Sequence, residues 1–265
     1  MIGQTKLQSQ IGETLDRFPR FSIFIGDKGS GRKTIIRQAL KGLGTIQECV
    51  IDVDSVREVI EQAYKTVSPM IYVFADADNM SVASKNALLK VTEESPNNAY
   101  FVMTLVNPEN TLQTIRSRAQ IFLMDAYTPD EVLEYYHNRT TDTDDEIIQR
   151  YCLTMGDVDL LCSYDVSEFE KFVKTVIDNA EKVSGANSFK IGAKLNLGSD
   201  EKKYDLGLFW KAFRSECLAR MEKDPLKYIA GINVTSKYLS ELKIGGVNLQ
   251  MCFDNWLLDL RKAWM

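Results

Sequence analysis

Nine residues near the N-terminus, GDKGSGRKT, have the glycine spacing of a phosphate-binding loop. They follow the apolar run 21–25 and open an amphipathic stretch, so we expect a loop between a strand and a helix. In such a loop the backbone N–H groups bind phosphate oxygens, helped by the helix N-terminus. Gly26, Gly29 and Gly31 supply the glycines. In an active loop, a lysine then contacts the phosphates and a Ser or Thr hydroxyl holds Mg²⁺.

The residues that follow these glycines change that chemistry. Arg32 takes the lysine position and Lys33 takes the hydroxyl position. Thr34 comes one residue late, which places it about 100° around the helix from the metal. Arg32 can still contact a phosphate, but the Lys33 ammonium has only donors and cannot ligate Mg²⁺. We therefore assign the three glycines, Arg32, Lys33 and Thr34 to a degenerate nucleotide site.

A second apolar run, 70–74, is followed by residues that are also poorly suited to hold Mg²⁺. An Mg²⁺-dependent hydrolase of this class ends such a strand with Asp and Glu, which hold the metal and polarise the attacking water. Here Ala75 and Asp76 follow, and a register that makes Asp76 the first acid puts Ala77 in the second place. We assign Asp76 to the degenerate site, and two separate losses at one metal predict no hydrolysis. The alternative for Asp76 and Asp78 is a solvated strand end that caps the next helix.

The rare residues exclude several classes of site. The single histidine, His137, has no motif of a catalytic triad or zinc protease around it. The five cysteines contain no C-x-x-C pair and are odd in number, which excludes zinc and a disulfide framework. We interpret the cysteines as buried free thiols and expect no bound metal.

Charge and hydropathy set further limits. Lys and Arg number 32 against 37 Asp and Glu, a net charge of −5, which excludes a generally basic DNA-coating protein. The N-terminal residues lack a signal-peptide pattern, and no apolar run reaches the length of a membrane span. With free thiols, these features predict a cytoplasmic protein without membrane contact.

The elements that must position these residues are strands that alternate with amphipathic helices. Apolar runs at 21–25, 49–53, 70–76, 99–106 and 119–124 predict a parallel sheet that helices cover on both faces. Beyond Thr128 and Pro129 we expect helices only. The predicted fold class is α/β followed by all-α, with domains 1–127, 128–165 and 166–265. All three tryptophans fall in the last domain, where we expect them to anchor a helical core.

Four segments in order carry a resemblance to a known family. They are the glycine loop and the stretches MIGQTKL, DADNMSVASKNALLKVTEESP and NPENTLQTIRSRAQ. The last three resemble the V-G-Q, A-D-x-M…N-A-L-L-K-x-x-E-E-P and N-P-x-x-L-x-x-T-I-x-S-R-C-Q elements of AAA+ clamp-loader subunits. The resemblance covers residues 1–125 and implies an AAA+ sheet, a helical lid domain and a C-terminal helical collar domain. Because its nucleotide motifs are impaired, the chain most resembles the delta-prime type of subunit of bacterial DNA polymerase III. The resemblance implies a bacterial or phage relative that lacks the zinc module.

That resemblance implies a stator-like subunit that does not hydrolyse ATP by itself. With ATPase subunits and a delta-like subunit, it would help to load a sliding clamp onto primer–template DNA. Arg118, in Ser-Arg-Ala where the family has Ser-Arg-Cys, would be an arginine finger for the ATP of a neighbouring subunit. Lys85 and Lys90 would lie on a helix that faces the DNA. Whether ATP or ADP binds at the degenerate site without hydrolysis is left open.

Two more positions weaken an active-ATPase interpretation. The family's first sensor position, near Leu105 and Val106, has no polar side chain before Asn107, and residues 155–161 contain no arginine for the second sensor. The alternatives are a divergent but active clamp-loader ATPase, a P-loop nucleotide kinase or transferase, and an interaction protein that binds no nucleotide. The kinase alternative needs a metal-binding hydroxyl and an acidic base, which the sequence does not supply.

Overall fold

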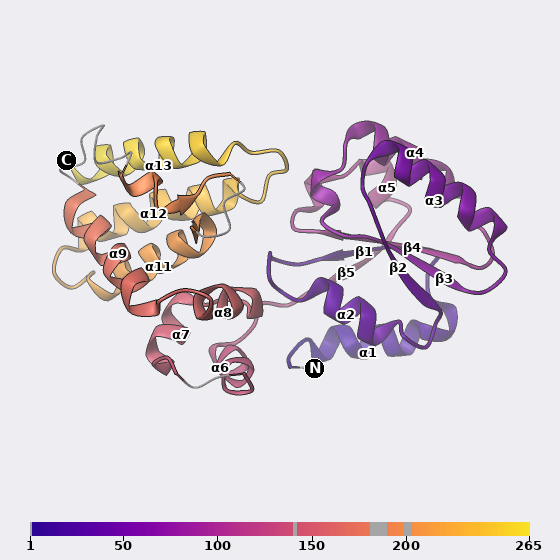
Figure 1. Ribbon diagram of the computed structural model, residues 1–265, viewed down its shortest axis with the longest axis horizontal. Coiled ribbons are helices and arrows are strands. Elements are labelled where there is room, and N and C mark those ends of the chain that lie inside the picture. Colours follow the sequence, from indigo (N-terminus) through magenta and orange to yellow (C-terminus); the bar gives the residue numbers. More distant parts are fainter. Residues whose placement is uncertain (1, 140–141, 181–189, 199–202) are drawn as a thin grey trace. The chain divides into compact units, whose positions relative to one another are not determined.

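The computed structural model describes residues 2–139, 142–180, 190–198 and 203–265 (Figure 1). The chain divides into two compact units, Met1–Tyr127 and Thr128–Met265. No helix within these described ranges has the length and apolar character needed to cross a membrane.

The N-terminal unit is built on a five-stranded sheet in the order β2-β3-β4-β1-β5. All four strand pairs are parallel, and Ile23 at the centre of β1 lies opposite Met103 of β4 and Ile121 of β5. Because parallel strands end at one edge, the residues that follow β1, β3 and β4 meet there. The strands are β1 Phe21–Ile25, β2 Thr45–Cys49, β3 Met70–Phe74, β4 Ala99–Leu105 and β5 Gln120–Leu123.

Helices cover both faces of this sheet, as predicted (Figure 1). Apolar side chains of α1 and α2, such as Ile11 and Ile35, pack with Phe24 on one face. Side chains of α3 and α4, such as Val59 and Leu88, pack on the other face. The bounds are α1 Thr5–Thr14, α2 Arg32–Ala39, α3 Val53–Lys65, α4 Val82–Glu93 and α5 Gln113–Arg116, with 3₁₀ turns η1 Leu15–Arg17, η2 Ala77–Asn79 and η3 Pro108–Asn110.

The predicted strand at 49–53 is wrong in its position. The strand is Thr45–Cys49, and it is only half-buried, so its apolar signal is weak. Asp52 instead caps α3, since its carboxylate accepts the N–H groups of Asp54 and Ser55 at 3.1 and 3.0 Å. The apolar residues after Cys49 therefore belong to the strand–helix connection.

Over its described residues, the C-terminal unit is helical apart from one short strand pair. Its helices are α6 Pro129–His137, α7 Asp145–Tyr151, α8 Met155–Cys162, α9 Val166–Asn179, α11 Leu206–Ala219, α12 Pro225–Glu241 and α13 Leu249–Trp264. Strands β6 Leu195–Asn196 and β7 Tyr204–Asp205 pair in parallel, so the expectation of helices alone was wrong there.

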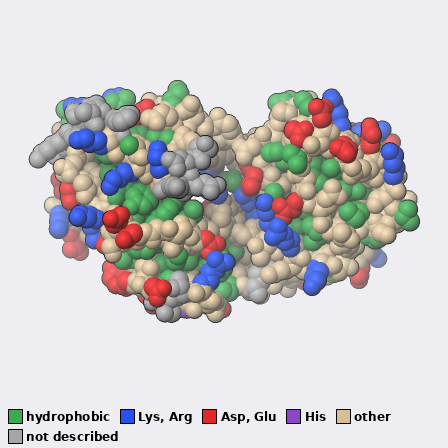
Figure 2. Space-filling model, viewed as in Figure 1, with side chains coloured by type: hydrophobic (Ala, Val, Ile, Leu, Met, Phe, Trp, Pro, Cys, Tyr) green, Lys and Arg blue, Asp and Glu red, His purple; other side chains and the backbone are tan. Residues whose placement is uncertain are grey.

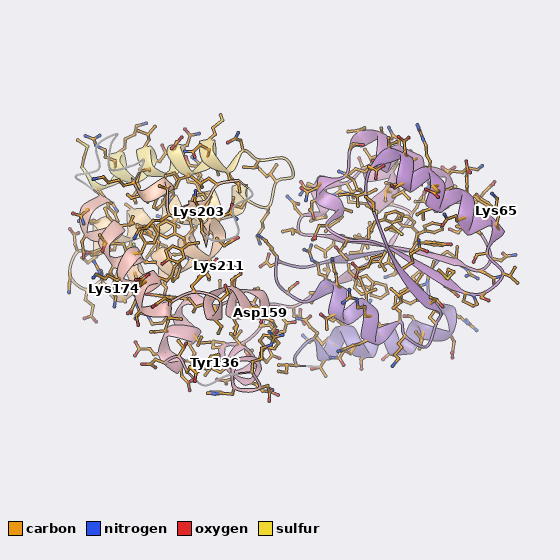
Figure 3. The ribbon with its side chains drawn as sticks, viewed as in Figure 1. Lys65, Tyr136, Asp159, Lys174, Lys203 and Lys211 are labelled. Carbon is orange, nitrogen blue, oxygen red and sulfur yellow. The ribbon has the colours of Figure 1, made fainter. Side chains whose placement is uncertain are left out.

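Capping groups fix the first helices of this unit. Thr128 and Glu131 form a capping box at the start of α6. Tyr136, labelled in Figure 3, is buried in α6 and donates its hydroxyl proton to the Thr143 carbonyl at 2.8 Å. This bond ties the connection after α6 back to the helix.

The tryptophans lie in a helical core, as expected from the sequence. Trp210 and Trp256 are fully buried, and their rings lie 5.8 Å apart. The indole N–H of Trp256 donates to the hydroxyl of Thr235 at 3.1 Å, so its one polar atom is satisfied inside the core.

All five cysteines are free thiols. Burial raises the pKa of Cys49 and of Cys217 to about 12. Such groups stay protonated at neutral pH and are unreactive. Cys162 is exposed, which corrects the expectation that every thiol is buried.

Basic and acidic side chains are interspersed over the face of each unit that Figure 2 shows. This agrees with the slightly acidic composition of the chain. It gives no support to a broad basic surface on that face.

Candidate functional site

The glycine loop has the backbone conformation that its sequence predicts. Gly29 and Gly31 have positive φ angles of 80° and 83°, which a residue with a side chain rarely adopts. A Cβ at Gly26 would lie 2.7 Å from the Ser30 hydroxyl oxygen, so a side chain there would force Ser30 to move. Gly31 is the N-cap of α2, and the loop therefore directs the helix N-terminus towards the sheet edge.

Side chains from the end of the sheet hold this loop. The Tyr127 hydroxyl donates to the Ser30 carbonyl at 2.7 Å, and the Ser30 hydroxyl donates to the sulfur of Met124 at 3.4 Å. Ser30 is 3% exposed. The loop thus keeps the backbone shape of a phosphate loop. Its Ser30 side chain packs against Met124, the residue that follows β5.

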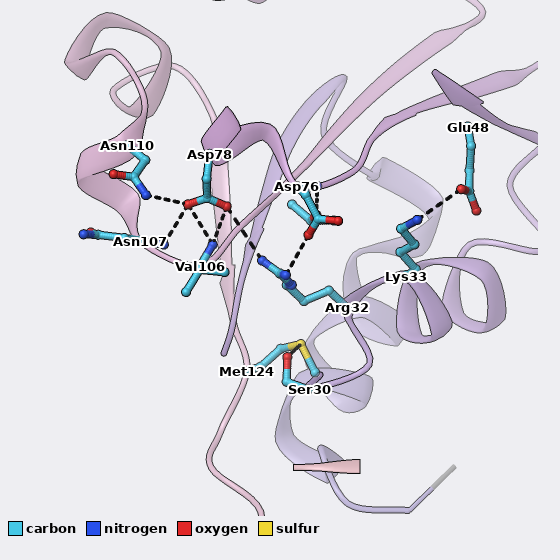
Figure 4. Close-up of polar contacts among 11 residues, drawn as sticks. Ser30, Arg32, Lys33, Glu48, Asp76, Asp78, Val106, Asn107, Asn110 and Met124 are labelled. Atoms are coloured by element: carbon cyan, nitrogen blue, oxygen red, sulfur yellow. Dashed lines mark hydrogen bonds and ion pairs between the residues drawn. The ribbon is translucent and has the colours of Figure 1, made fainter. Parts of the chain in front are cut away.

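The centre of the site is an ion pair between two sequence-predicted residues, Arg32 and Asp76 (Figure 4). An Nη2 hydrogen of Arg32 is donated to Asp76 Oδ1 at 2.9 Å, and the Arg32 side chain is only 7% exposed. Asp76 has a φ of 49°, and its N–H donates to the Thr104 hydroxyl of β4 at 2.8 Å. A non-glycine residue in this conformation is held there by its surroundings.

Asp78 joins the same cluster, although it is not among the site residues predicted from the sequence. Its carboxylate accepts the N–H of Val106 at 2.9 Å, the N–H of Asn107 at 3.1 Å and the side-chain amide of Asn110 at 2.8 Å. It is 9% exposed and lies 4.0 Å from Nη1 of Arg32.

The alternative of a solvated strand end is therefore wrong for Asp78. Ser81, not Asp78, caps α4 through the N–H of Ser84 at 3.0 Å. The sequence signal that could have identified Asp78 is the presence of two acidic residues, at alternate positions, just after a buried strand. Sequence alone did not show that the residues after β4 would supply its donors.

Lys33 and Thr34 lie outside this cluster. The Lys33 ammonium lies 3.3 Å from Glu48 of β2, and Thr34 is exposed on α2. Hydrogen bonds from Arg37 and Lys33 lower the pKa of Glu48, so this carboxylate is ionised and pairs with both cations. The position of a metal-binding hydroxyl is occupied by a cation that points to another strand.

These residues do not fit an Mg²⁺ ion. One carboxylate of the sheet edge is paired with a buried guanidinium, and the other accepts three N–H groups and faces the same guanidinium. No hydroxyl stands at the position of Lys33. A divalent cation prefers free oxygen ligands, and a fixed positive charge beside the same carboxylates opposes its binding.

We predict that Arg32→Ala lowers the stability of the N-terminal unit by about 1–3 kcal/mol, because it removes the buried guanidinium that pairs with Asp76 and faces the Asp78 carboxylate. Lys33→Ala is the matched control, since its ion pair is exposed and contributes less than about 1 kcal/mol. Hydrogen-exchange protection of the β1 and β3 amides measures the difference. Equal losses in the two variants would contradict the role given to Arg32.

The two lysines predicted to contact DNA have different environments. Lys85 is 7% exposed, and its ammonium donates to the Asn110 carbonyl. Burial lowers the pKa of Lys85, and the charge of Asp78 opposes that shift. Lys85 is thus engaged inside the unit and does not present its charge to an outside phosphate, which argues against that prediction. Lys90 is exposed, with its Nζ 5.4 Å from the centre of the Tyr64 ring.

Arg118 lies after α5, two residues before β5 begins. Its side chain is 38% exposed and contacts Glu93 and the Thr114 carbonyl, each at 2.9 Å. These partners are outside the cluster of Arg32, so the predicted finger and the degenerate loop are separate sites on one unit.

The stretch 155–161, which lacks an arginine, begins helix α8 of the C-terminal unit. Asp157 is buried there and accepts the N–H groups of Leu153 and Thr154, both at 2.9 Å. Lys211 of α11, labelled in Figure 3, reaches the same carboxylate at 2.7 Å. The polar groups of this helix start are engaged with one another within the unit.

Comparison with known proteins identifies relatives of this architecture. The family model described as "DNA polymerase III, delta subunit" matches residues 18–128. DNA polymerase III subunit delta' of Haemophilus influenzae is 28% identical over 110 residues, which cover 40% of this chain and 33% of the relative. DNA polymerase III subunit gamma of Buchnera aphidicola is 24% identical over 169 residues, which cover 51% of this chain and 47% of the relative. The chain thus spans less than half the length of these curated relatives.

Solved structures share the fold over most of the chain. A DNA polymerase III gamma subunit-related protein of Thermotoga maritima superimposes with a TM-score of 0.55 and 15% identity, covering 98% of this chain and 100% of that protein. RuvB, a Holliday junction branch migration motor of Thermotoga maritima, gives a TM-score of 0.51 and 15% identity, covering 97% and 87%. The predicted fold class is confirmed: the fold is that of AAA+ proteins. Through residues 18–128, the chain is similar to DNA polymerase III clamp-loader subunits.

Proposed function

We propose that this chain is a stator-like subunit of a DNA polymerase clamp loader, which does not hydrolyse ATP itself. The ion pair between Arg32 and Asp76 carries the proposal, because a protein cation engages the carboxylate that a hydrolase would offer to a metal. The cation at position 33 and the match of residues 18–128 to the family model support the same conclusion.

In this proposal the chain works with other subunits in the cytoplasm. ATPase subunits and a delta-like subunit are its partners, and the assembly opens a sliding clamp and places it on primer–template DNA. The helical residues 128–165 would serve as the lid and residues 166–265 as the collar that joins the subunits. Any DNA contact would involve a few exposed lysines such as Lys90, in agreement with the net charge of −5.

Arg118 would act on the ATP of a neighbouring subunit. Its guanidinium is partly exposed at the end of α5, and its two contacts use only part of its five N–H donors. A guanidinium supplied by a neighbour stabilises the negative charge that develops on the transferred phosphoryl group. A subunit without hydrolysis can therefore still be required for hydrolysis in the complex.

The test compares the isolated chain with the reconstituted complex. We expect no phosphate release above background when the isolated chain is incubated with Mg²⁺ and ATP. The DNA-stimulated hydrolysis of its own ATPase subunits should depend on adding the chain. Release by the isolated chain that is lost in Arg32→Ala would overturn the proposal and support a divergent active ATPase.

A further inference from the structure

The side chain of Arg118 is held at two points. Nη2 of its guanidinium contacts the Glu93 carboxylate at 2.9 Å, and Nη1 donates to the Thr114 carbonyl at 2.9 Å. Thr114 lies in α5 and Glu93 is the last residue of α4, so the two contacts come from different helices. Two anchors on a planar group fix its orientation as well as its position.

Glu93 stands where an acidic residue is otherwise unfavourable. The C-terminal end of a helix carries a partial negative charge, and a carboxylate there is repelled by it. Glu93 and Glu94 both lie at this end of α4. The positive charge of the Arg118 guanidinium compensates the negative charge of the Glu93 carboxylate at this helix end.

The end of α4 is itself anchored to the unit. The Tyr64 hydroxyl of α3 donates to the Glu94 carbonyl at 3.1 Å, and the Ser95 hydroxyl donates to the Val91 carbonyl. The buried Leu88 and Val91 pack the helix onto the sheet. Glu93 therefore extends from a helix end that is held in place. Its carboxylate can hold the exposed Arg118 guanidinium in a fixed position.

The pair remains accessible. The Arg118 side chain is 38% exposed and that of Glu93 is 57% exposed. Since exposed ion pairs contribute little to folding, the stability of the unit does not explain this contact well. The guanidinium keeps further N–H donors that neither Glu93 nor Thr114 uses, and these can bind an incoming phosphate.

We propose that Glu93 is the positioning residue of the arginine finger: it holds the Arg118 guanidinium in the orientation in which it meets the nucleotide phosphate of a neighbouring subunit. This rests on the proposed function, because it needs a neighbour that hydrolyses ATP. Preorganisation of a charged group lowers the barrier since no reorientation is required at the moment of reaction.

The experiment uses the reconstituted complex with primed DNA and compares Glu93→Gln with Glu94→Gln. The Glu94 carboxylate makes no ion pair with any residue that the structure describes, so Glu94→Gln removes an equal charge from the same helix end. We expect Glu93→Gln to lower kcat about two- to fivefold, the range of an exposed charge contact. KM for ATP should not change, because the finger acts in the transition state. Glu94→Gln should match the unmodified complex.

A double-mutant cycle with Arg118→Ala separates positioning from other effects. If Glu93 acts through Arg118, Glu93→Gln has no further effect in the Arg118→Ala background. A kcat in Glu93→Gln that is unchanged or raised would overturn the positioning role, as would an additive loss in the double variant. If Arg118→Ala alone leaves hydrolysis unchanged, the proposed finger fails first, so the two failures are distinguishable.

Discussion

Arg118→Ala should reduce the DNA-stimulated ATP hydrolysis of the complex by about 10³–10⁵-fold in kcat at the site that this chain completes. The substitution removes the one group proposed to neutralise charge on the transferred phosphoryl group. It does not touch the sheet or the packed faces of the helices, because Arg118 is partly exposed after α5. Assembly of the complex should therefore persist, which size-exclusion chromatography measures beside phosphate release.

Arg116→Ala is the matched control for this experiment. Arg116 lies two residues earlier, at the end of the same short helix, and pairs with Glu109. It carries the same charge, so a general change in surface charge would affect both variants alike. Hydrolysis that survives Arg118→Ala, or that falls equally in Arg116→Ala, would remove the finger role. Other active sites in the assembly continue to hydrolyse ATP and limit the loss that can be measured. Single-turnover hydrolysis therefore gives the clearest value.

Trp256→Ala should lower the stability of the C-terminal unit by about 3–5 kcal/mol. The Trp256 ring is fully buried and contacts Phe209 and Phe213 edge to face, at 5.7 and 5.1 Å between ring centres. Its removal leaves a cavity among residues of several helices. It also removes the N–H group that donates a hydrogen bond to the Thr235 hydroxyl. A loss of this size is a large part of the stability of a small unit.

Urea unfolding followed by tryptophan fluorescence measures this loss. All three tryptophans lie in the C-terminal unit, so Trp210 and Trp264 report its unfolding without a signal from the sheet. Leu258→Ala on the same helix is the control, because Leu258 is 55% exposed and its loss leaves no cavity. A midpoint for Trp256→Ala equal to that of Leu258→Ala would show that the tryptophan does not anchor this core.

The sequence by itself determined the central sheet and its loop. Strands such as 21–25 and 99–105 are continuous apolar runs because they are covered on both faces, and their pattern is unambiguous. The loss of nucleotide chemistry was also visible, since it depends only on which residue type stands at positions 32, 33 and 75. The strand at 45–49 was misplaced because it is half-exposed, and its polar residues hide it from a search for buried runs.

Only the tertiary structure decided how the charged residues pair. Arg32 and Asp76 are 44 residues apart, and they meet because parallel strands end at one edge of the sheet. The same edge brings Asp78 to the backbone of the next strand and draws Lys85 inward to Asn110.

Sequence fixes which residues carry charge, but pairing depends on distances and burial that exist only after the helices pack. For this reason Lys85 was predicted to contact DNA and a solvated strand end stood as the alternative for Asp78, whereas both belong to one internal network. The contact between Arg118 and Glu93 has the same origin, because it joins the ends of two helices that only the packed sheet brings together.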